Sequence, residues 1–585
     1  MKIGLAQIEV KPLEVEKNLE KILSYIEKAK KAGLEVVVFP EMAVGGYLVG
    51  DEWENEDYID KLLQANEDIK NHSGGIVVIW GNVDVDRLKK NEDGRWRKYN
   101  AGFVASDGEW VVGGVGAGKT YKTLMPKYRE FDDERHFCSL QKYASDEGKE
   151  ISNLLKPFEI CDRKIGVMMC EDMWSDDYTI SPTEVLVNNG VEMIINLSCS
   201  PWTIGKNDKR HRVVKTRVAE SKTPFLYCNN VGIQNNGKNI FVFDGGSTIY
   251  NTEGKITGEL ESFEEGLLIY DDQKEASQKE LKKDDTTAEL WRGIVYGLKK
   301  FLEKIGVEKI VIGLSGGIDS SVVACLLVSA LGKERIVGIN MPSQFNSDLT
   351  KTAAKKLAEN LGVTYKIIPI SESVELTVKQ LTSAGFELSE LAIENIQARD
   401  RGSRILAGVA GAIGAVFTNN GNKTETALGY CTLYGDVNGA IAPIADLYKG
   451  QVYELARYAN KIMGEVIPKE ILEVVPSAEL SKNQDVTAGK GDPMIYPYHD
   501  KLLKAFVEWR WGKKKILNSY RTGEITTELN LEKPIEGYFE NEIEFVADLE
   551  DKWRKYKLAI FKRVQAPPII AVSRRAFGFD LRESI

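Results

Sequence analysis

Seven consecutive residues in the second half of the chain have the composition of a phosphate-binding loop. They run from Ser315 to Ser321 (SGGIDSS) and follow the apolar segment Ile310 to Leu314, which has the pattern of a buried strand. Glycines at such a position let backbone N–H groups approach an anion, and the start of a following helix favours negative charge. Asp319 would repel the anion unless a divalent cation such as Mg²⁺ bridges carboxylate and phosphate. The loop therefore predicts a phosphate-bearing ligand bound together with a metal ion.

A second glycine-rich segment competes with this loop. Gly113 to Thr120 (GGVGAGKT) fits the G-x-x-x-x-G-K-[ST] pattern of Walker A loops. A Walker loop must open a helix whose first turn binds the phosphates, but here Tyr121 to Met125 and Pro126 follow, without the apolar spacing of an amphipathic helix. We therefore expect the match to be accidental and the segment to be a loop.

Two strand-end residues in the first half of the chain have side chains that suit attack on an amide. Glu41 follows the apolar run Val36 to Phe39, and Cys170 follows Gly166 to Met169, so we expect both at one rim of a sheet. A cysteine nucleophile needs a base and a donor for the oxyanion. None of the four histidines lies in a matching strand-end context, so carboxylate and lysine must supply these roles. Taken alone, each residue would be an ordinary core cysteine or a solvated carboxylate.

The segments around these residues alternate between strand and helix patterns, which predicts an α/β fold in both halves. In the first half, strands are expected at 2–8, 35–39, 76–80, 165–169, 193–197 and 225–228, with a helix at 15–29 ending at Gly33. In the second half, strands at 309–314, 336–341 and 365–370 alternate with helices at 288–304, 321–331 and 349–361, which implies a parallel sheet. Residues 271–287 are almost free of apolar side chains, so we expect domains at 1–270 and 288–585 joined by a linker.

The bulk properties limit the class of protein. A chain of 585 residues is too long for one hydrophobic core, and 43% apolar with 28% charged residues is ordinary for a globular protein. The net charge of −10 gives no overall attraction for nucleic acid or for an anionic membrane. No apolar run has the length of a spanning helix and no basic leader precedes the first strand, so we expect a cytoplasmic protein. The seven cysteines form no CxxC pair, which supports neither a zinc site nor a disulfide framework.

The motifs resemble those of two known enzyme groups. The loop at Ser315 to Ser321 resembles the pyrophosphate-binding loop of ATP pyrophosphatases, which split ATP to AMP and pyrophosphate while they adenylate a substrate. Glu41, Cys170 and a lysine ahead of Leu124 to Phe131 (LMPKYREF) resemble the Glu-Lys-Cys triad of the nitrilase amidase superfamily. Lys122 matches the triad lysine by its spacing to Pro126, with Lys119 as the nearest alternative.

Further segments of the second half resemble successive signatures of the NAD synthetase family. They are Glu394 to Arg399 (ENIQAR), Gly421 to Glu425 (GNKTE), Tyr434 to Asp436 (YGD) and Asp446 to Lys449 (DLYK). With the amidase-like half in front, the resemblance spans nearly the whole chain and points to the glutamine-dependent branch of that family. It implies a nitrilase-like αββα sandwich, then a Rossmann-like parallel-sheet domain of the adenine nucleotide alpha hydrolase type with a C-terminal helical extension. It also implies the reaction: ammonia from glutamine amidates ATP-adenylated deamido-NAD, giving NAD, AMP, pyrophosphate and glutamate.

The resemblance carries roles over to individual residues, with Mg²⁺, ATP, glutamine and deamido-NAD as ligands and a homo-oligomer, possibly an octamer, as the assembly. In the first domain it makes Glu41 the base, Lys122 the oxyanion stabiliser and Cys170 the nucleophile, and it makes Tyr128, Ser200 and Lys206 glutamine contacts. The ATP contacts are Leu314, Ser315, Gly316, Gly317, Ile318, Asp319, Ser320, Ser321, Asn420, Lys449 and Ser477. The deamido-NAD contacts are Asn395, Arg399, Glu425, Tyr430 and Lys562, and the metal ligands are Asp319 and Glu425.

Two positions depart from the family pattern. Asn420 stands where the family usually has threonine, which leaves its ATP contact open, and Lys206 stands where arginine is frequent and offers a point charge in place of a planar fork. Two other functions also remain open. One is an amidotransferase with a different acceptor, such as a purine nucleotide, and the other is a non-catalytic adenine-nucleotide sensor. Taken alone, the segment Glu394 to Arg399 also fits the charged surface of a helix. Likewise, Lys423 to Glu425 fits the start of a helix capped by a side-chain hydroxyl.

Overall fold

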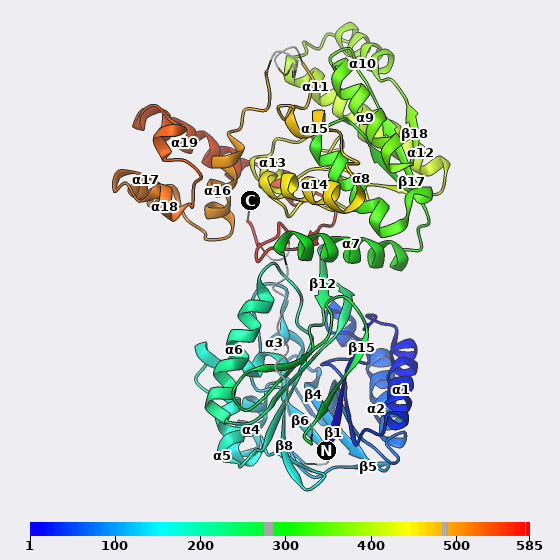
Figure 1. The fold of residues 1–585 in the computed structure, drawn as a ribbon, viewed down its shortest axis with the longest axis vertical. Coiled ribbons are helices and arrows are strands. Elements are labelled where there is room, and N and C mark those ends of the chain that lie inside the picture. Colours follow the sequence, from blue (N-terminus) through cyan, green and yellow to red (C-terminus); the bar gives the residue numbers. More distant parts are fainter. Residues whose placement is uncertain are drawn as a thin grey trace. The chain divides into compact units, whose positions relative to one another are not determined.

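The chain forms two compact units in the computed structural model (Figure 1). The structure describes residues 1–116, 118–235, 237–273, 285–481, 484, 486, 489–578 and 581–584. Unit 1 comprises Met1–Gly237 and Phe241–Asp284, and unit 2 comprises Lys238–Ile240 and Asp285–Ile585. Of the predicted linker 271–287, residues 274–284 lie outside the described part of the chain. No helix in the described part is long and apolar enough to cross a membrane.

Two large β-sheets form the main body of unit 1. The first has the order β15-β1-β2-β3-β4-β5 with β6 beside β4, and the second has the order β14-β13-β10-β9-β8-β7. The strands of the first sheet are β1 (Lys2–Gln7), β2 (Val36–Val38), β3 (Val77–Lys90), β4 (Trp96–Ser106), β5 (Glu109–Trp110), β6 (Lys119–Tyr121) and β15 (Gly266–Asp271). Those of the second are β7 (Phe158–Ile160), β8 (Arg163–Met169), β9 (Met193–Ser198), β10 (Phe225–Asn229), β13 (Thr248–Tyr250) and β14 (Ile256–Glu259).

The two sheets pack face to face and share one core. Val38 and Ile79 of the first sheet belong to the same buried cluster as Val167, Ile195 and Leu226 of the second. Because successive side chains of a strand point to opposite faces, the remaining residues of each strand face outward. These outer faces are covered by α1 (Val15–Lys31) and α2 (Glu56–Asn71) on one side and by α5 (Pro182–Asn188) and α6 (Lys206–Ser221) on the other (Figure 1). This is the predicted αββα sandwich.

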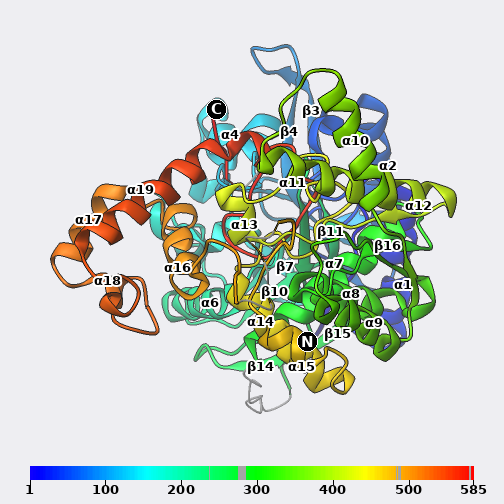
Figure 2. The same ribbon diagram turned by 90° about the horizontal axis from the view of Figure 1, so that it is seen from above.

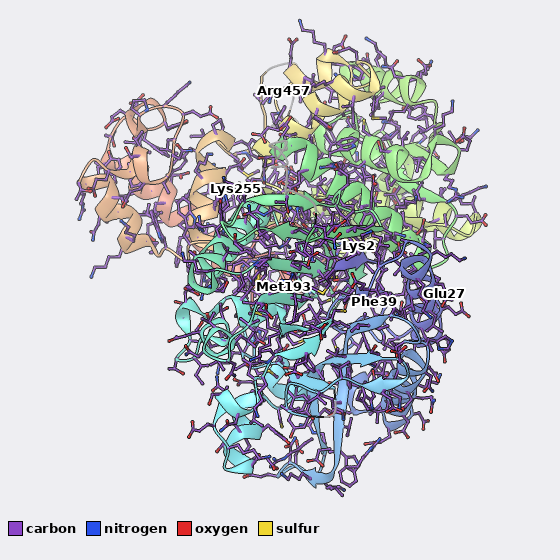
Figure 3. All side chains as sticks on the ribbon, turned by 60° about the horizontal axis from the view of Figure 1, so that its bottom comes forward. Lys2, Glu27, Phe39, Met193, Lys255 and Arg457 are labelled. Carbon is purple, nitrogen blue, oxygen red and sulfur yellow. The ribbon has the colours of Figure 1, made fainter. Side chains whose placement is uncertain are left out.

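Helix α1 shows how the sequence pattern places a helix on its sheet. Ile22, Ile26 and Ala29, spaced three or four residues apart, are fully buried, whereas Glu27 between them is exposed. Figure 3 shows Glu27 at the outer surface of this helix and Phe39, which follows β2, inside the unit. The segment that matched the Walker A pattern leads into strand β6 and not into a helix, so the expectation that the match is accidental is confirmed.

Unit 2 contains a parallel sheet of order β18-β17-β16-β19. Its strands are β16 (Ile310–Gly313), β17 (Ile336–Asn340), β18 (Thr364–Ile367) and β19 (Val416–Phe417), and the helices around it include α7 (Thr286–Lys304), α8 (Ile318–Leu331), α9 (Asp348–Leu361), α11 (Glu390–Arg399) and α14 (Lys449–Met463). Helix α8 is buried along most of its length, with Val322, Cys325 and Leu326 at 0% exposure. A helix that is apolar on all sides lies in the centre of a domain. The glycine-rich loop directly precedes the N-terminus of this buried helix.

The last part of the chain adds a second core to unit 2. It consists of α16 (Tyr496–Val507), α17 (Lys513–Arg521), α18 (Ile525–Glu528), α19 (Glu542–Leu558) and α20 (Ile560–Arg563). Leu502 and Phe506 of α16 and Phe545 and Leu549 of α19 belong to one buried cluster. Figures 1 and 2 show α16 to α19 beside the parallel sheet rather than on it. These are the helices of the predicted C-terminal extension.

Candidate active sites

Cys170 lies where strand β8 turns into the short 3-10 helix Cys170–Met173 of unit 1. Its φ of +25° is a strained value for a residue with a Cβ, and such strain concentrates at functional sites. The buried carboxylate of Asp172 stabilises this turn, because it accepts hydrogen bonds from the backbone N–H groups of Met169 at 3.1 Å, Thr123 at 3.0 Å and Leu124 at 2.8 Å. One side chain therefore ties the Cys170 turn to the residues that follow Lys122.

The Lys122 ammonium is the centre of a buried charge cluster. Its Nζ lies 2.9 Å from Glu41 Oε1, 2.8 Å from Asp133 Oδ2 and 3.1 Å from the Tyr47 hydroxyl. The structure thus brings the predicted Glu41 and Lys122 together and adds Asp133, which the sequence reading missed. Asp133 lies among charged residues in the sequence, and nothing in that pattern distinguished it from its exposed neighbours. The alternative lysine, Lys119, instead pairs with Asp84 at 2.8 Å.

The charges of this cluster determine the protonation of Cys170. Burial raises the pKa of the Cys170 thiol, the Glu41 carboxylate raises it further, and Lys122 opposes both. Burial also raises the pKa of Glu41, against the field of Lys122. Burial alone would lower the pKa of Lys122, but Asp133 and Glu41 outweigh it, so the net shift is upward and the ammonium keeps its charge. Cys170 is therefore a neutral thiol at pH 7 that needs a base before it can attack.

Each of the three predicted glutamine contacts forms a hydrogen bond with another residue of unit 1. The Tyr128 hydroxyl donates to Oε2 of Glu171, the residue after Cys170, at 2.8 Å. The backbone N–H of Ser200 donates to Asn229 Oδ1 at 2.9 Å. Lys206 begins α6, its Nζ donates to the carbonyl oxygen of Pro201 at 2.6 Å, and burial lowers its pKa to about 8.

In unit 2, a cavity of about 450 Å³ is lined by the glycine-rich loop. Gly316 has a φ of +86°, and a Cβ there would lie 2.2 Å from the carbonyl oxygen of Thr350, so only glycine fits. The hydroxyls of Ser320 and Ser321 donate to the carbonyl oxygen of Gly317 at 3.1 and 2.8 Å, inside the first turn of α8. Helix α8 therefore begins three residues earlier than predicted and presents its N-terminus to the cavity.

Two carboxylates and one ammonium meet at this cavity. Lys449 Nζ lies 2.5 Å from Asp319 Oδ2 and 3.0 Å from Glu425 Oε1. Asn422 Nδ2 donates to the other oxygen of Asp319 at 3.0 Å, and the Tyr496 hydroxyl donates to Glu425 at 3.1 Å. The described residues contain no group of three His, Cys, Asp or Glu side chains that could bind a metal ion alone. A pair of carboxylates fits Mg²⁺, which usually takes one or two from the protein and the rest of its oxygens from phosphate and water.

Two family models match the chain, one for each unit. The carbon-nitrogen hydrolase model matches residues 2–279 and the NAD synthase model matches residues 290–532. The glutamine-dependent NAD(+) synthetase of Synechocystis sp. is 33% identical, over 100% of this chain and 98% of its own length. This chain belongs to the glutamine-dependent NAD(+) synthetase family. The match confirms the family, the fold and the enzyme class that the sequence predicts, an ATP-dependent ligase with glutamine as amide donor.

Other members of the glutamine-dependent NAD(+) synthetase family match over similar lengths. That of Thermotoga maritima is 31% identical over 100% of this chain and 98% of its own. The solved structure of the Acinetobacter baumannii enzyme in complex with ADP has a TM-score of 0.72 at 27% identity, covering 99% of this chain and 97% of that one. The Cytophaga hutchinsonii structure, with a TM-score of 0.78 at 19% identity, shares the fold.

Most of the residues assigned from this family lie at the unit 2 cavity. The lining includes Leu314, Ser315, Gly316, Gly317, Ile318, Asp319, Ser320, Asn395, Asn420, Glu425, Tyr430, Lys449, Ser477 and Lys562. The Asn420 side-chain amide donates a hydrogen bond to the carbonyl oxygen of Gly313, at the end of β16, at 3.1 Å. One of its donor groups is therefore used by the backbone. Lys562 Nζ donates to the carbonyl oxygens of Gly429 and Cys431 at 2.8 and 2.5 Å, beside Tyr430.

Two of the predicted residues do not line this cavity. Ser321 is buried in α8, and the Arg399 side chain donates from Nε to the carbonyl oxygen of Leu433 at 3.3 Å. Arg401 lines the cavity instead, with its Nε donating to the carbonyl oxygen of Met341 at 3.0 Å. Arg401 belongs to a π-helical segment, Asp400–Leu406, that continues α11. The wider π turn changes which side chains share a face, and ordinary helical spacing does not predict that change.

Proposed function

We propose that this chain makes NAD from deamido-NAD, ATP and glutamine, with glutamine hydrolysis at Cys170 in unit 1 and amide formation at the cavity of unit 2. One observation carries the proposal furthest. Asp319, Glu425 and Lys449 come from three separate segments, and all three side chains meet beside the glycine-rich loop. A loop for phosphates, two carboxylates for a metal ion and a lysine for negative charge are the groups that adenylation by ATP requires.

In unit 1, the reaction begins with a proton transfer. Glu41 takes the proton of Cys170, and its raised pKa makes it a stronger base than an exposed carboxylate. The thiolate then attacks the side-chain amide carbon of glutamine, and the Lys122 ammonium stabilises the oxyanion that forms. Protonated Glu41 then gives this proton to the amide nitrogen, the C–N bond breaks, ammonia leaves and a thioester remains on Cys170. Water, activated by Glu41, releases glutamate from the thioester.

In unit 2, the nicotinate carboxylate of deamido-NAD attacks the α-phosphorus of ATP, and pyrophosphate leaves. The loop N–H groups and the start of α8 bind the phosphates, and Lys449 offsets their negative charge. Asp319 and Glu425 would hold Mg²⁺, which when bound neutralises charge on the phosphate oxygens. Ammonia then displaces AMP and forms the amide. Ammonium, the protonated form, is not a nucleophile. We therefore expect neutral ammonia to travel between the sites on a path protected from water.

The proposal is tested by following all products at once. With deamido-NAD, ATP and glutamine, the enzyme should release NAD, AMP and glutamate in equal amounts. An amidotransferase for another acceptor would instead use xanthylate in a parallel assay, and a nucleotide sensor would bind ATP and release no AMP. We also expect a homo-oligomer, which light scattering after gel filtration would measure.

The depressed pKa of Lys206 predicts how glutamine use depends on pH. Burial lowers this pKa to about 8, so the side chain is an ammonium below pH 8 and loses its charge above it. If the ammonium binds the α-carboxylate of glutamine, kcat/KM for glutamine falls about fourfold from pH 7 to 8.5. Lys206→Arg keeps the charge and should remove this fall, and synthesis with free ammonia should not show it. An unchanged profile in Lys206→Arg would exclude Lys206 as its source.

Asp133, which the sequence did not reveal, should increase the basicity of Glu41. Its negative charge raises the pKa of Glu41, so Asp133→Asn should lower that pKa and weaken Glu41 as a base. We expect kcat/KM for glutamine to fall roughly 10²-fold. The acidic limb of the pH profile of kcat/KM should move to lower pH, and synthesis with added ammonia should be retained. The adjacent, partly exposed Asp132 provides the control Asp132→Asn, which should behave as wild type. An acidic limb that stays in place in Asp133→Asn would show that Asp133 does not act through Glu41.

A further inference from the structure

Asn100 is a fully buried asparagine of strand β4 that contacts two members of the charge cluster in unit 1. Its side-chain Nδ2 donates to Glu41 Oε1 at 2.7 Å, and its backbone carbonyl oxygen accepts the N–H of Lys122 at 2.9 Å. Strand pairing places it there, because Ala101, the next residue of β4, lies opposite Tyr121 of β6. Asn100 has no role in the reaction described so far.

The surroundings of the Asn100 carboxamide determine its orientation. Glu41 Oε1 also accepts a hydrogen bond from the Lys122 ammonium at 2.9 Å, so this oxygen is an acceptor and the amide nitrogen of Asn100 must face it. Asn100 Oδ1 then has no hydrogen-bond partner among the described residues. A buried polar atom without a partner costs stability, and an apolar side chain of similar size would avoid that cost. Packing alone therefore does not explain an asparagine at this position.

The two carboxylate oxygens of Glu41 differ in the donors that they face. Oε1 accepts from Lys122 Nζ at 2.9 Å and from Asn100 Nδ2 at 2.7 Å, and these two bonds use both of its lone pairs. Within the described part of the chain, Oε2 accepts one bond, from the backbone N–H of Cys199 at 2.9 Å, and keeps one lone pair. Oε2 can therefore take up the proton of Cys170 without the loss of a hydrogen bond.

We propose that Asn100 is a positioning residue for glutamine hydrolysis: together with Lys122 it occupies Oε1 of Glu41, so that Oε2 takes the proton of the Cys170 thiol. The inference rests on the function proposed above for unit 1. The S–H bond breaks, an O–H bond forms at Oε2, and the sulfur keeps the electron pair with which it attacks the amide carbon. The hydrogen bond from Asn100 also favours the ionised form of Glu41, which is the form that acts as a base.

This hydrogen bond gives Asn100 an effect on the pH dependence of the reaction. The titratable groups around Glu41 are Lys122, Asp133, Tyr47, Cys170 and Cys199. Burial raises the pKa of Glu41 most, Lys122 opposes this, Asp133 raises the pKa further, and the hydrogen bond from Asn100 lowers it. Loss of the Asn100 donor therefore moves the pKa of Glu41 upward, opposite to the shift expected for Asp133→Asn.

The test measures kcat/KM for glutamine against pH in wild type, Asn100→Leu and the matched control Asn82→Leu. Leucine is similar in size to asparagine and has no side-chain donor. Asn82 is equally buried, on the neighbouring strand β3, but its Nδ2 donates to the carbonyl oxygen of Leu62 at 2.9 Å and not to Glu41. We expect Asn100→Leu to move the acidic limb upward by about one pH unit, which lowers kcat/KM about tenfold on that limb. Above the limb, kcat/KM should change by less than about threefold, and Asn82→Leu should leave the limb in place.

The outcomes separate this inference from the function on which it rests. An acidic limb that stays in place in Asn100→Leu, or an equal loss of kcat/KM at every pH, would show that Asn100 acts on the fold alone and would overturn the inference. Melting temperature and ammonia-supported synthesis show whether each variant is intact. If Asn100→Leu does not fold, Asn100→Ala provides the same test, because it removes the same donor without added bulk. If wild type releases no glutamate from glutamine, the proposed function of unit 1 fails instead.

Discussion

Cys170→Ala removes glutamine-supported NAD synthesis, by at least about 10⁴-fold, and leaves ammonia-supported synthesis within about twofold of wild type. In the proposed mechanism Cys170 is the sulfur nucleophile of unit 1, and alanine offers no atom that can form the thioester. The rest of the triad does not depend on the thiol, because Lys122 keeps its contacts to Glu41 and Asp133. Unit 2 has its own cavity and its own carboxylates, so added ammonia replaces the missing product.

The assay measures NAD and glutamate with glutamine, then NAD with ammonium salts at a pH where free ammonia is present. A matched control is Cys228→Ala, which also removes a fully buried thiol from unit 1 but lies in the core of strand β10. That variant should lose stability, about 1 kcal/mol for a small core truncation, and keep both activities. Loss of both activities in Cys170→Ala alone would contradict two separate sites.

Asp319→Ala removes synthesis with either nitrogen source, by at least roughly 10³-fold, because both routes share the adenylation step. The change deletes one of the two carboxylates that we propose as Mg²⁺ ligands and one of two carboxylate partners of Lys449. The Lys449 ammonium then pairs with Glu425 alone. This pairing neutralises the one remaining carboxylate and so opposes binding of a metal ion there. Glutamine hydrolysis in unit 1 should continue, since Asp319 belongs to unit 2.

Two measurements check this assignment. Pyrophosphate release from ATP and deamido-NAD reports adenylation directly, and titration of Mn²⁺ in the presence of ATP reports the metal site without turnover. The control is Asp348→Ala, which removes an exposed aspartate from the equivalent first turn of α9 and should keep full activity. Wild-type activity or wild-type Mn²⁺ affinity in Asp319→Ala would refute Asp319 as a metal ligand.

Much of the fold and of the site is local information, which explains why the sequence predicted it. Apolar runs such as Gly166 to Met169 determine a buried strand by themselves, and the residue after the run must then lie at the sheet rim. Gly316 is predictable for the same reason, since a strand-to-helix turn around an anion requires a backbone without a Cβ. Cys170, Asp319 and their neighbouring motifs were found in this way, and their order along the chain predicted the family.

What only the tertiary structure decided are the partners of charged groups. Nothing in the charged run from Asp132 to Arg135 shows that Asp133 alone of these residues reaches Lys122. Arg401, and not Arg399, lines the unit 2 cavity, and Arg401 lies in a π-helical turn that no residue spacing predicts. For the partners of charged groups the physical reason is that the energy of a charge depends on its desolvation and on neighbours distant in sequence, and both are determined when the chain packs.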